Sequence, residues 1–235
     1  NEILSPIAMT MLCTKSRLIF AFLVFGLLGV AQQSKPHFAQ PQLVFSNQVS
    51  ANYDVNFGVA SRFQQFEDSK LHSKFLELSH FSSWRMSSGH KISIGLLYRF
   101  SEQFDDTKPN EFRLTQQYQS TLRPHVIRFS HRLRLEERFV DSKFITRLRY
   151  RFGLDFPLNG QELNVGEAYA LANVESLLQL QNSISPKYDF RALTGIGALI
   201  SPDVILQMSI QYRLAHLSNI QTGKWFVFFG GYIKI

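Results

Sequence analysis

Two runs in which charged and large apolar residues alternate constrain the fold of this chain more than any other feature. Residues 132–139 read Arg-Leu-Arg-Leu-Glu-Glu-Arg-Phe, and residues 144–152 read Phe-Ile-Thr-Arg-Leu-Arg-Tyr-Arg-Phe after a short turn. Side chains of a β-strand point alternately to opposite faces, so each run predicts a strand with one apolar and one arginine-rich face. Such runs exceed the ~5–6 residues usual for globular strands. They are typical of a transmembrane β-barrel, which has lipid on one face and a wet interior on the other.

The same two-residue period continues along the chain, in segments that include residues 53–63, 92–100, 204–214 and 225–235. Counting from residue 53, we expect ten such segments, with residues 43–49 as a further edge or partial strand. No convincing amphipathic helix interrupts them. The sequence therefore predicts an all-β fold. Because single-chain bacterial barrels have even strand numbers, ten and twelve strands are the candidates. We expect a closed antiparallel transmembrane β-barrel of about 10–12 strands, preferably ten, with an arginine-rich interior.

The N-terminal residues predict export from the cytoplasm. Lys15 and Arg17 precede an apolar run over residues 18–30, which ends in small residues suited to cleavage. We expect residues 1–31 to contain upstream residues and a cleaved secretory signal peptide, and residues 32–235 to form a single outer-membrane barrel domain. A membrane-anchor helix is the alternative, but the apolar run is shorter than the ~20 residues that such a helix needs.

The net charge and the single cysteine limit which partners and which reactions are compatible with the sequence. The formal net charge is +7, which by itself would raise nucleic acid as a partner. Export and the alternation of arginine with apolar residues favour a basic barrel interior instead. The expected partners are outer-membrane lipid, the barrel insertion machinery and a small anion, and no nucleic acid. Cys13, the single cysteine, would leave with the signal peptide, so thiol chemistry is excluded in the mature protein. We expect no cofactor.

The arginine-rich hairpin has a testable register. A two-residue turn at Asp141-Ser142 pairs Leu135 with Leu148 on the apolar face and Arg134 with Arg149 on the other. Like charges directly opposite each other are destabilising, so the arginines need acids from neighbouring strands, water or an anion. The same facing rule puts Glu175 in the interior. We therefore predict a lumenal charge cluster of Arg132, Arg134, Glu136, Arg147, Arg149, Arg151 and Glu175.

Candidates for catalysis are weaker. Some outer-membrane barrels are lipid-modifying hydrolases that use Ser and His, and this chain contains both residue types. His131 falls on the apolar face of its strand, where packing is the commoner role for histidine. His80 and Ser82 share a face two residues apart. No histidine spacing suggests a metal site, and we assign no catalytic, cofactor-binding or metal-binding residue.

Several stretches of the sequence resemble a known family, the bacterial envelope proteins grouped as domain of unknown function 2490. The resemblance covers roughly residue 42 to the C-terminus. It is carried by Asn110-Glu111-Phe112-Arg113, residues 130–139, residues 147–151, Pro157-Leu158-Asn159-Gly160 and residues 169–175. It implies a signal peptide and a β-barrel in the cell outer membrane, but no established activity, ligand or catalytic residue.

Function is less constrained than fold. The arginine face predicts either a salt-bridged plug that fills a narrow barrel or an anion-selective pore or anionic-ligand site. We expect a structural, small-pore or anion-binding barrel, with a lipid-modifying hydrolase as the alternative. A conductance trace and a lipid-hydrolysis assay would separate them.

Overall fold

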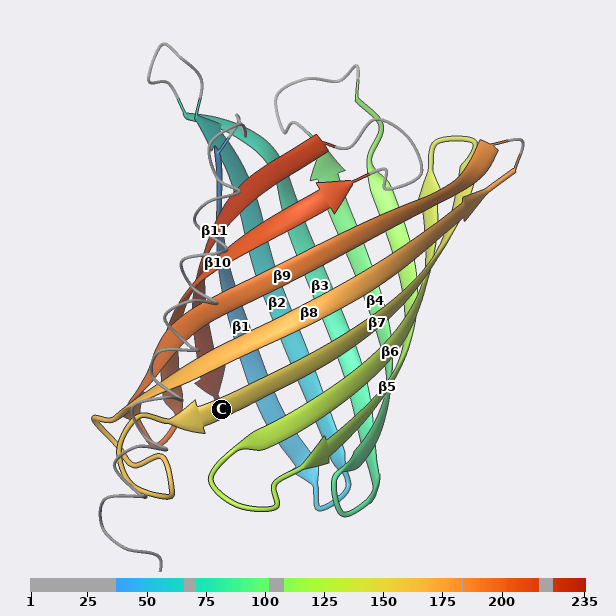
Figure 1. The fold of residues 1–235 in the computed structure, drawn as a ribbon. Coiled ribbons are helices and arrows are strands. Elements are labelled where there is room, and N and C mark those ends of the chain that lie inside the picture. The colour runs from blue at the N-terminus through green and yellow to red at the C-terminus, as the bar shows by residue number, and fades with distance from the viewer. Residues whose placement is uncertain (1–36, 66–70, 102–107, 183, 216–221) are drawn as a thin grey trace, which may run out of the picture. The chain divides into compact units, whose positions relative to one another are not determined.

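The computed structural model describes residues 37–65, 71–101, 108–182, 184–215 and 222–235. These residues form a chain of β-strands connected by turns and loops (Figure 1). The strands are β1 (His37–Ser50), β2 (Tyr53–Gln65), β3 (Leu71–Ser87), β4 (His90–Ser101), β5 (Glu111–Leu122), β6 (Arg128–Val140), β7 (Lys143–Pro157), β8 (Ala168–Gln181), β9 (Ile184–Ser201), β10 (Val204–Ala215) and β11 (Thr222–Lys234). The predicted signal peptide, with Cys13, lies outside the described residues.

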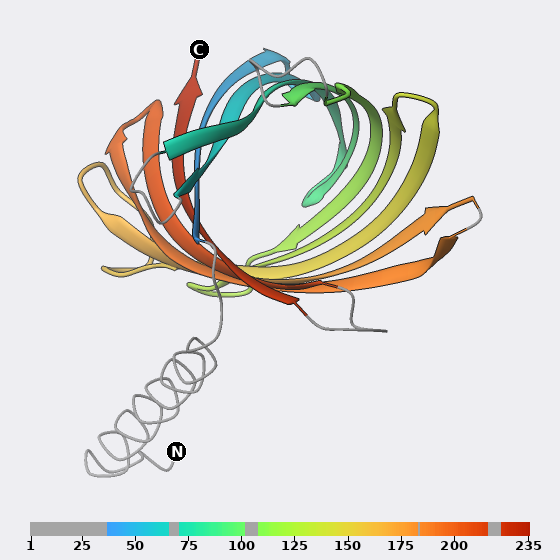
Figure 2. The same ribbon diagram turned by 90° about the horizontal axis from the view of Figure 1, so that it is seen from above.

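The eleven strands close into a barrel, as Figure 2 shows from above. Each strand pairs antiparallel with its neighbour in sequence, and the barrel closes by a parallel pairing of β1 with β11. The predicted all-β closed barrel is confirmed. The preferred count of ten was wrong, because residues 43–49 belong to a full strand of 14 residues. An odd number of alternating strands leaves the first and last running in the same direction, so this closure is parallel.

The register of the β6–β7 hairpin is the predicted one. Leu135 is the partner of Leu148, and Arg134 is the partner of Arg149. Asp141 in the turn has a φ of 52°, a left-handed conformation that Asp tolerates better than most residues. A slip of one residue would move every apolar side chain of the hairpin to the opposite face. The alternation of residue types therefore determines the pairing.

Alternation also separates the two faces of the wall around the barrel. Large apolar side chains project outward and stay exposed, among them Phe57, Ile94, Leu133 and Met208, which are between 47 and 54% exposed. Polar and charged side chains fill the inner face, where Glu175 and Glu136 are 1 and 2% exposed. The inner face is therefore mainly polar, with Phe75, Leu97, Leu177 and Phe226 as its buried apolar residues, and the outer face is mainly apolar.

Within the part of the chain that the structure describes, no helix is long and apolar enough to cross a membrane.

Candidate functional site

The carboxylate of Glu175 is the centre of one ion-pair cluster on the inner wall. It accepts hydrogen bonds from Arg132 at 2.9 Å, Arg149 at 2.6 Å, Arg151 at 3.1 Å and Arg191 at 3.2 Å. These arginines come from β6, β7 and β9, on both sides of β8. Four cations therefore share one carboxylate that is almost completely removed from solvent.

Glu136 on β6 forms a second centre. Its Oε1 lies 2.5 Å from Arg149 Nη1 and 3.6 Å from Arg134 Nη1, and its Oε2 lies 3.3 Å from Arg138 Nε. Arg149 thus donates to both acids. This arrangement holds the two like-charged pairs of the hairpin, in which Arg134 faces Arg149 and Arg132 faces Arg151.

The structure places all seven residues of the predicted cluster on the inner face, but not all of them in ion pairs. Arg147 donates to the neutral Gln179 Oε1 at 2.6 Å, although its Cα partner is Glu136. Arg134 directs its two shortest hydrogen bonds, of 2.9 and 2.6 Å, at Gln117. The side-chain oxygens of Gln117 and Gln179 thereby accept hydrogen bonds from arginines that outnumber the neighbouring glutamates.

A further cluster, which sequence reasoning did not find, lies across β3, β4 and β5. Glu111 accepts from Arg113 at 2.6 Å, pairs with Arg138 at 3.0 Å and lies 3.4 Å from Arg99. Glu77 pairs with Arg99 and lies 3.6 Å from Arg113. Because Arg138 contacts both Glu111 and Glu136, this cluster is continuous with the one on β6 and β7.

Aromatic rings extend the chain of contacts to the remaining strands. Arg99 lies 4.0 Å and Arg62 4.7 Å from the centroid of Phe75. Arg62 and Arg213 lie 4.9 and 3.7 Å from the centroid of Phe226, and Phe226 stacks on Phe38 at 4.7 Å. Cations over aromatic faces are held by the ring quadrupole. These contacts cross the parallel closure between β1 and β11.

Together these side chains form what we call the interior belt, a series of contacts that passes from strand to strand around the barrel. Among the described residues it has one break, between Arg191 on β9 and Arg213 on β10, which are Cα partners without an acid between them. The belt consists of Phe38, Gln40, Arg62, Phe75, Glu77, Arg99, Glu111, Arg113, Arg132, Arg134, Glu136, Arg138, Arg149, Arg151, Glu175, Arg191, Arg213 and Phe226.

A signal for the missed members was present in the sequence. Arg99, Glu111 and Arg113 occupy the polar phase of their alternating segments, as Arg134 does in its own. The facing rule therefore places them inside. It does not give their height along the barrel axis, which depends on the stagger between strands, so it could not show that Arg138 joins Glu111 to Glu136.

The outer wall carries the one Ser–His contact that the sequence suggested. His80 Nε2 lies 3.1 Å from Ser82 Oγ, and Tyr53 Oη lies 3.0 Å from the same oxygen. His80 also packs against Phe57, with ring centroids 4.7 Å apart. The Nδ1 atom of His80 is buried, and no group that the structure describes bonds to it. His131, by contrast, contacts Tyr150 Oη at 2.8 Å through its Nδ1.

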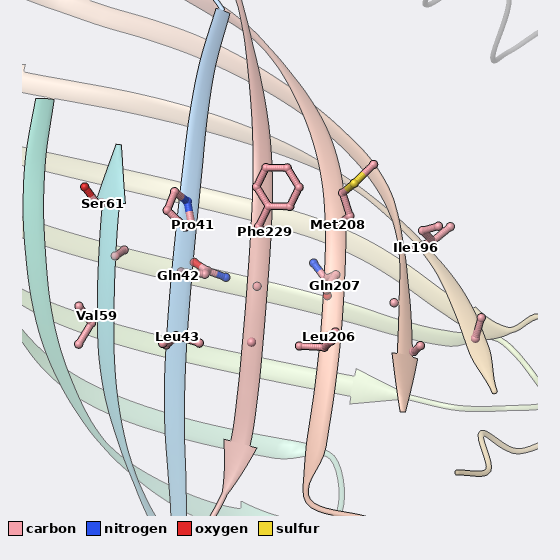
Figure 3. Close-up of a pocket in the computed structure, with 16 residues that line it drawn as sticks. Pro41, Gln42, Leu43, Val59, Ser61, Ile196, Leu206, Gln207, Met208 and Phe229 are labelled. Atoms are coloured by element: carbon pink, nitrogen blue, oxygen red, sulfur yellow. The ribbon is translucent and has the colours of Figure 1, made fainter. Parts of the chain in front are cut away.

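Another outer feature is an apolar hollow of about 730 Å³ at the closure. Figure 3 shows Phe229, Met208 and Ile196 on neighbouring strands around it, with Leu43 and Leu206 below them. Glycines and alanines of β8, β9 and β11 contribute the small residues of its lining. The lining is mainly apolar, and its polar residues are Gln42, Ser61 and Gln207.

Among the described residues, no group of three His, Cys, Asp or Glu side chains is arranged to hold a metal ion.

Comparison with known proteins identifies the family. The family model described as "Protein of unknown function (DUF2490)" matches residues 41–224, which include every strand at least in part. The chain belongs to this family. The family predicted from the arginine-rich hairpin and its flanking stretches is thereby confirmed.

One solved structure that matches part of this chain is described as outer-membrane expressed OmpT of Vibrio cholerae, with 9% sequence identity and a TM-score of 0.42. The match covers 69% of this chain and 54% of that protein, so the chain spans about half its length. No curated protein matches the sequence.

Proposed function

We propose that this DUF2490 protein is an outer-membrane β-barrel whose cation-rich interior selects small anions. The observation that carries the proposal is the interior belt, in which arginines outnumber the glutamates that they contact. Glu175 alone is shared by four arginines. Rings of arginine inside a barrel attract anions and repel cations.

The outer face supports the membrane assignment. Exposed apolar side chains recur at alternate positions of neighbouring strands, as Leu133, Leu148 and Tyr150 do at 43 to 47% exposure on β6 and β7. A contiguous apolar surface of this extent is uncommon on a protein surrounded by water, and it matches the lipid-facing band of a membrane barrel. The closed barrel also leaves no unpaired strand edge in the lipid.

The proposal is tested by fractionation and by conductance. We expect the protein in the outer-membrane fraction and, after refolding into a planar bilayer, a reversal potential in a KCl gradient that shows preference for chloride. Glu136→Gln and Glu175→Gln should increase that preference, because each removes a negative charge from the lumen. A cation-selective trace, or release of the protein as a soluble periplasmic species, would contradict the proposal.

One observation favours a second function, an outer-membrane lipid hydrolase. Ser82 and His80 are in hydrogen-bond contact on the lipid-facing side of the wall, which is where a lipid ester would reach them. Against it, the buried Nδ1 of His80 has no described partner that would hold the ring in the tautomer needed for general-base catalysis.

An assay of lipid hydrolysis by the refolded protein tests this second function. If Ser82 is a nucleophile, Ser82→Ala abolishes hydrolysis of a phospholipid substrate, whereas Ser79→Ala leaves it intact. Ser79 lies on the same strand but on the opposite face, with its hydroxyl directed at Gly58 O. Wild-type protein without hydrolytic activity, or equal activity of both variants, excludes Ser82 as a nucleophile.

A further inference from the structure

Two arginines of the interior belt have no carboxylate partner among the described residues. Arg62 donates to Gln40 Oε1 from its Nε at 3.1 Å and from its Nη2 at 2.9 Å. Arg213 donates from its Nε to Gln211 Oε1. Each therefore has a neutral amide where the other belt arginines have a glutamate, and its positive charge is not balanced by a direct contact.

These two arginines lie on the same ring. The guanidinium carbons of Arg213 and Arg62 are 3.7 and 4.9 Å from the centroid of Phe226, which is 3% exposed. Phe226 is on β11, between β10 and β1 in the barrel order. Two cations without a carboxylate partner among the described residues thus contact one ring at the closure of the barrel.

Arg191 adds a third cation beside them. It is the Cα partner of Arg213, and its Nη1 lies 3.2 Å from Glu175 Oε1, a carboxylate that three other arginines share. Its Nε is buried and has no hydrogen-bond partner in the described structure. This donor lies at the one break in the interior belt.

A buried donor without an acceptor and neighbouring like charges both cost free energy, and an anion that accepts hydrogen bonds from these guanidinium groups would offset both costs. Guanidinium groups bind phosphate and sulfate through paired N–H groups, which favours a tetrahedral oxyanion over a halide. We infer that Arg62, Arg191 and Arg213 form a binding site for a small soluble oxyanion such as inorganic phosphate. This inference rests on the proposed anion-selective interior and assigns its ligand class.

The test uses the full chain refolded in an uncharged detergent and titrated with inorganic phosphate, at constant ionic strength maintained with chloride. Saturable binding is measured by calorimetry and by the rise in unfolding temperature, because a ligand that binds only the folded state stabilises it. We expect Arg213→Gln and Arg62→Gln to weaken binding about ten- to a hundred-fold, the equivalent of losing a charge-assisted hydrogen bond.

Arg128→Gln is the matched control, since it removes one positive charge from an exposed arginine that pairs with Asp155 at 3.0 Å. This variant should bind phosphate with an affinity within about twofold of the wild-type value, because exposed ion pairs contribute little free energy. Arg213→Lys keeps the positive charge but loses the planar set of guanidinium donors, so its phosphate affinity should lie between those of the wild type and Arg213→Gln. It also provides the test if Arg213→Gln does not fold.

Absence of saturable binding in the wild-type protein would overturn the site, as would equal weakening by Arg128→Gln. The same preparation, tested for chloride preference in a bilayer, separates this result from the proposed function. Chloride preference without phosphate binding refutes only the site. Phosphate binding without chloride preference refutes only the anion-selective pore.

Discussion

At the scale of single residues, the inner face of this barrel has more arginines than glutamates to pair with them. Glu175 and Glu136 are nearly inaccessible to solvent, and Arg149 donates to both. Neutral amides take the place of carboxylates at Arg147, where the acceptor is Gln179, and at Arg62, where it is Gln40. A buried charge that loses its partner is more costly than the pair is stabilising. The two glutamates are therefore the positions where a conservative change does most damage.

Replacement of Glu175 by Gln should lower the free energy of unfolding by about 3–5 kcal/mol, the typical cost of removing one partner from a buried ion pair. The measurement is urea unfolding of the refolded barrel in detergent. Glu162→Gln serves as control, because Glu162 is exposed in the loop between β7 and β8. Equal unfolding midpoints for the two variants would show that the arginines do not depend on Glu175.

At the scale of strands, the two faces of the wall differ in what they tolerate. On β6 the outward Leu133 alternates with the inward Arg132 and Arg134, and the register with β7 keeps like faces together. The two-residue repeat predicted which residues of the hairpin face the same way, and the two-residue turn at Asp141-Ser142 then predicted the register. It did not predict β1 at full length, since Gln40, Gln42 and Pro41 interrupt the apolar pattern near its start. Sequence periodicity also does not give the stagger between neighbouring strands. It therefore could not predict the contact of Arg138 with Glu111.

An arginine introduced on the outer face tests the assignment of faces. Leu133→Arg should destabilise the inserted barrel by about 2–4 kcal/mol if its position is near the bilayer midplane. Asn56→Arg, on the inner face of β2, should insert normally. The check is the fraction of heat-modifiable, folded protein after refolding into lipid vesicles. Similar losses for both variants would mean that the faces are wrongly assigned.

At the scale of the whole molecule, closure depends on one parallel pairing. β1 and β11 are in register from His37 with Trp225 to Ser46 with Lys234, and Phe38 stacks on Phe226 across this closure. The even strand number expected for bacterial barrels was wrong here, because β1 is a full strand of the wall and raises the count to eleven. The family was predictable from the hairpin motifs, but the direction of closure was not, since strand pairing between chain ends leaves no local signal.

A cross-link tests the closure directly. On a Cys13→Ser background, Ser46→Cys together with Lys234→Cys should form a disulfide under mild oxidation, because these residues are Cα partners in the parallel register. Ser46→Cys with Ile233→Cys should not, since neighbouring residues point to opposite faces. The readout is gel mobility with and without reductant. A barrel of ten strands without β1 in the wall would fail to cross-link either pair.

The parallel pairing of β1 with β11 also decides how the chain can be rearranged. Since both strands run in the same direction, the start of β1 and the end of β11 lie at opposite rims of the wall. Circular permutation, which relies on joining neighbouring termini with a short linker, would here require a linker that traverses the whole height of the barrel. In a bilayer, reporter groups fused before His37 and after Lys234 would face opposite compartments, so an impermeant reagent added to one side would label only one of them.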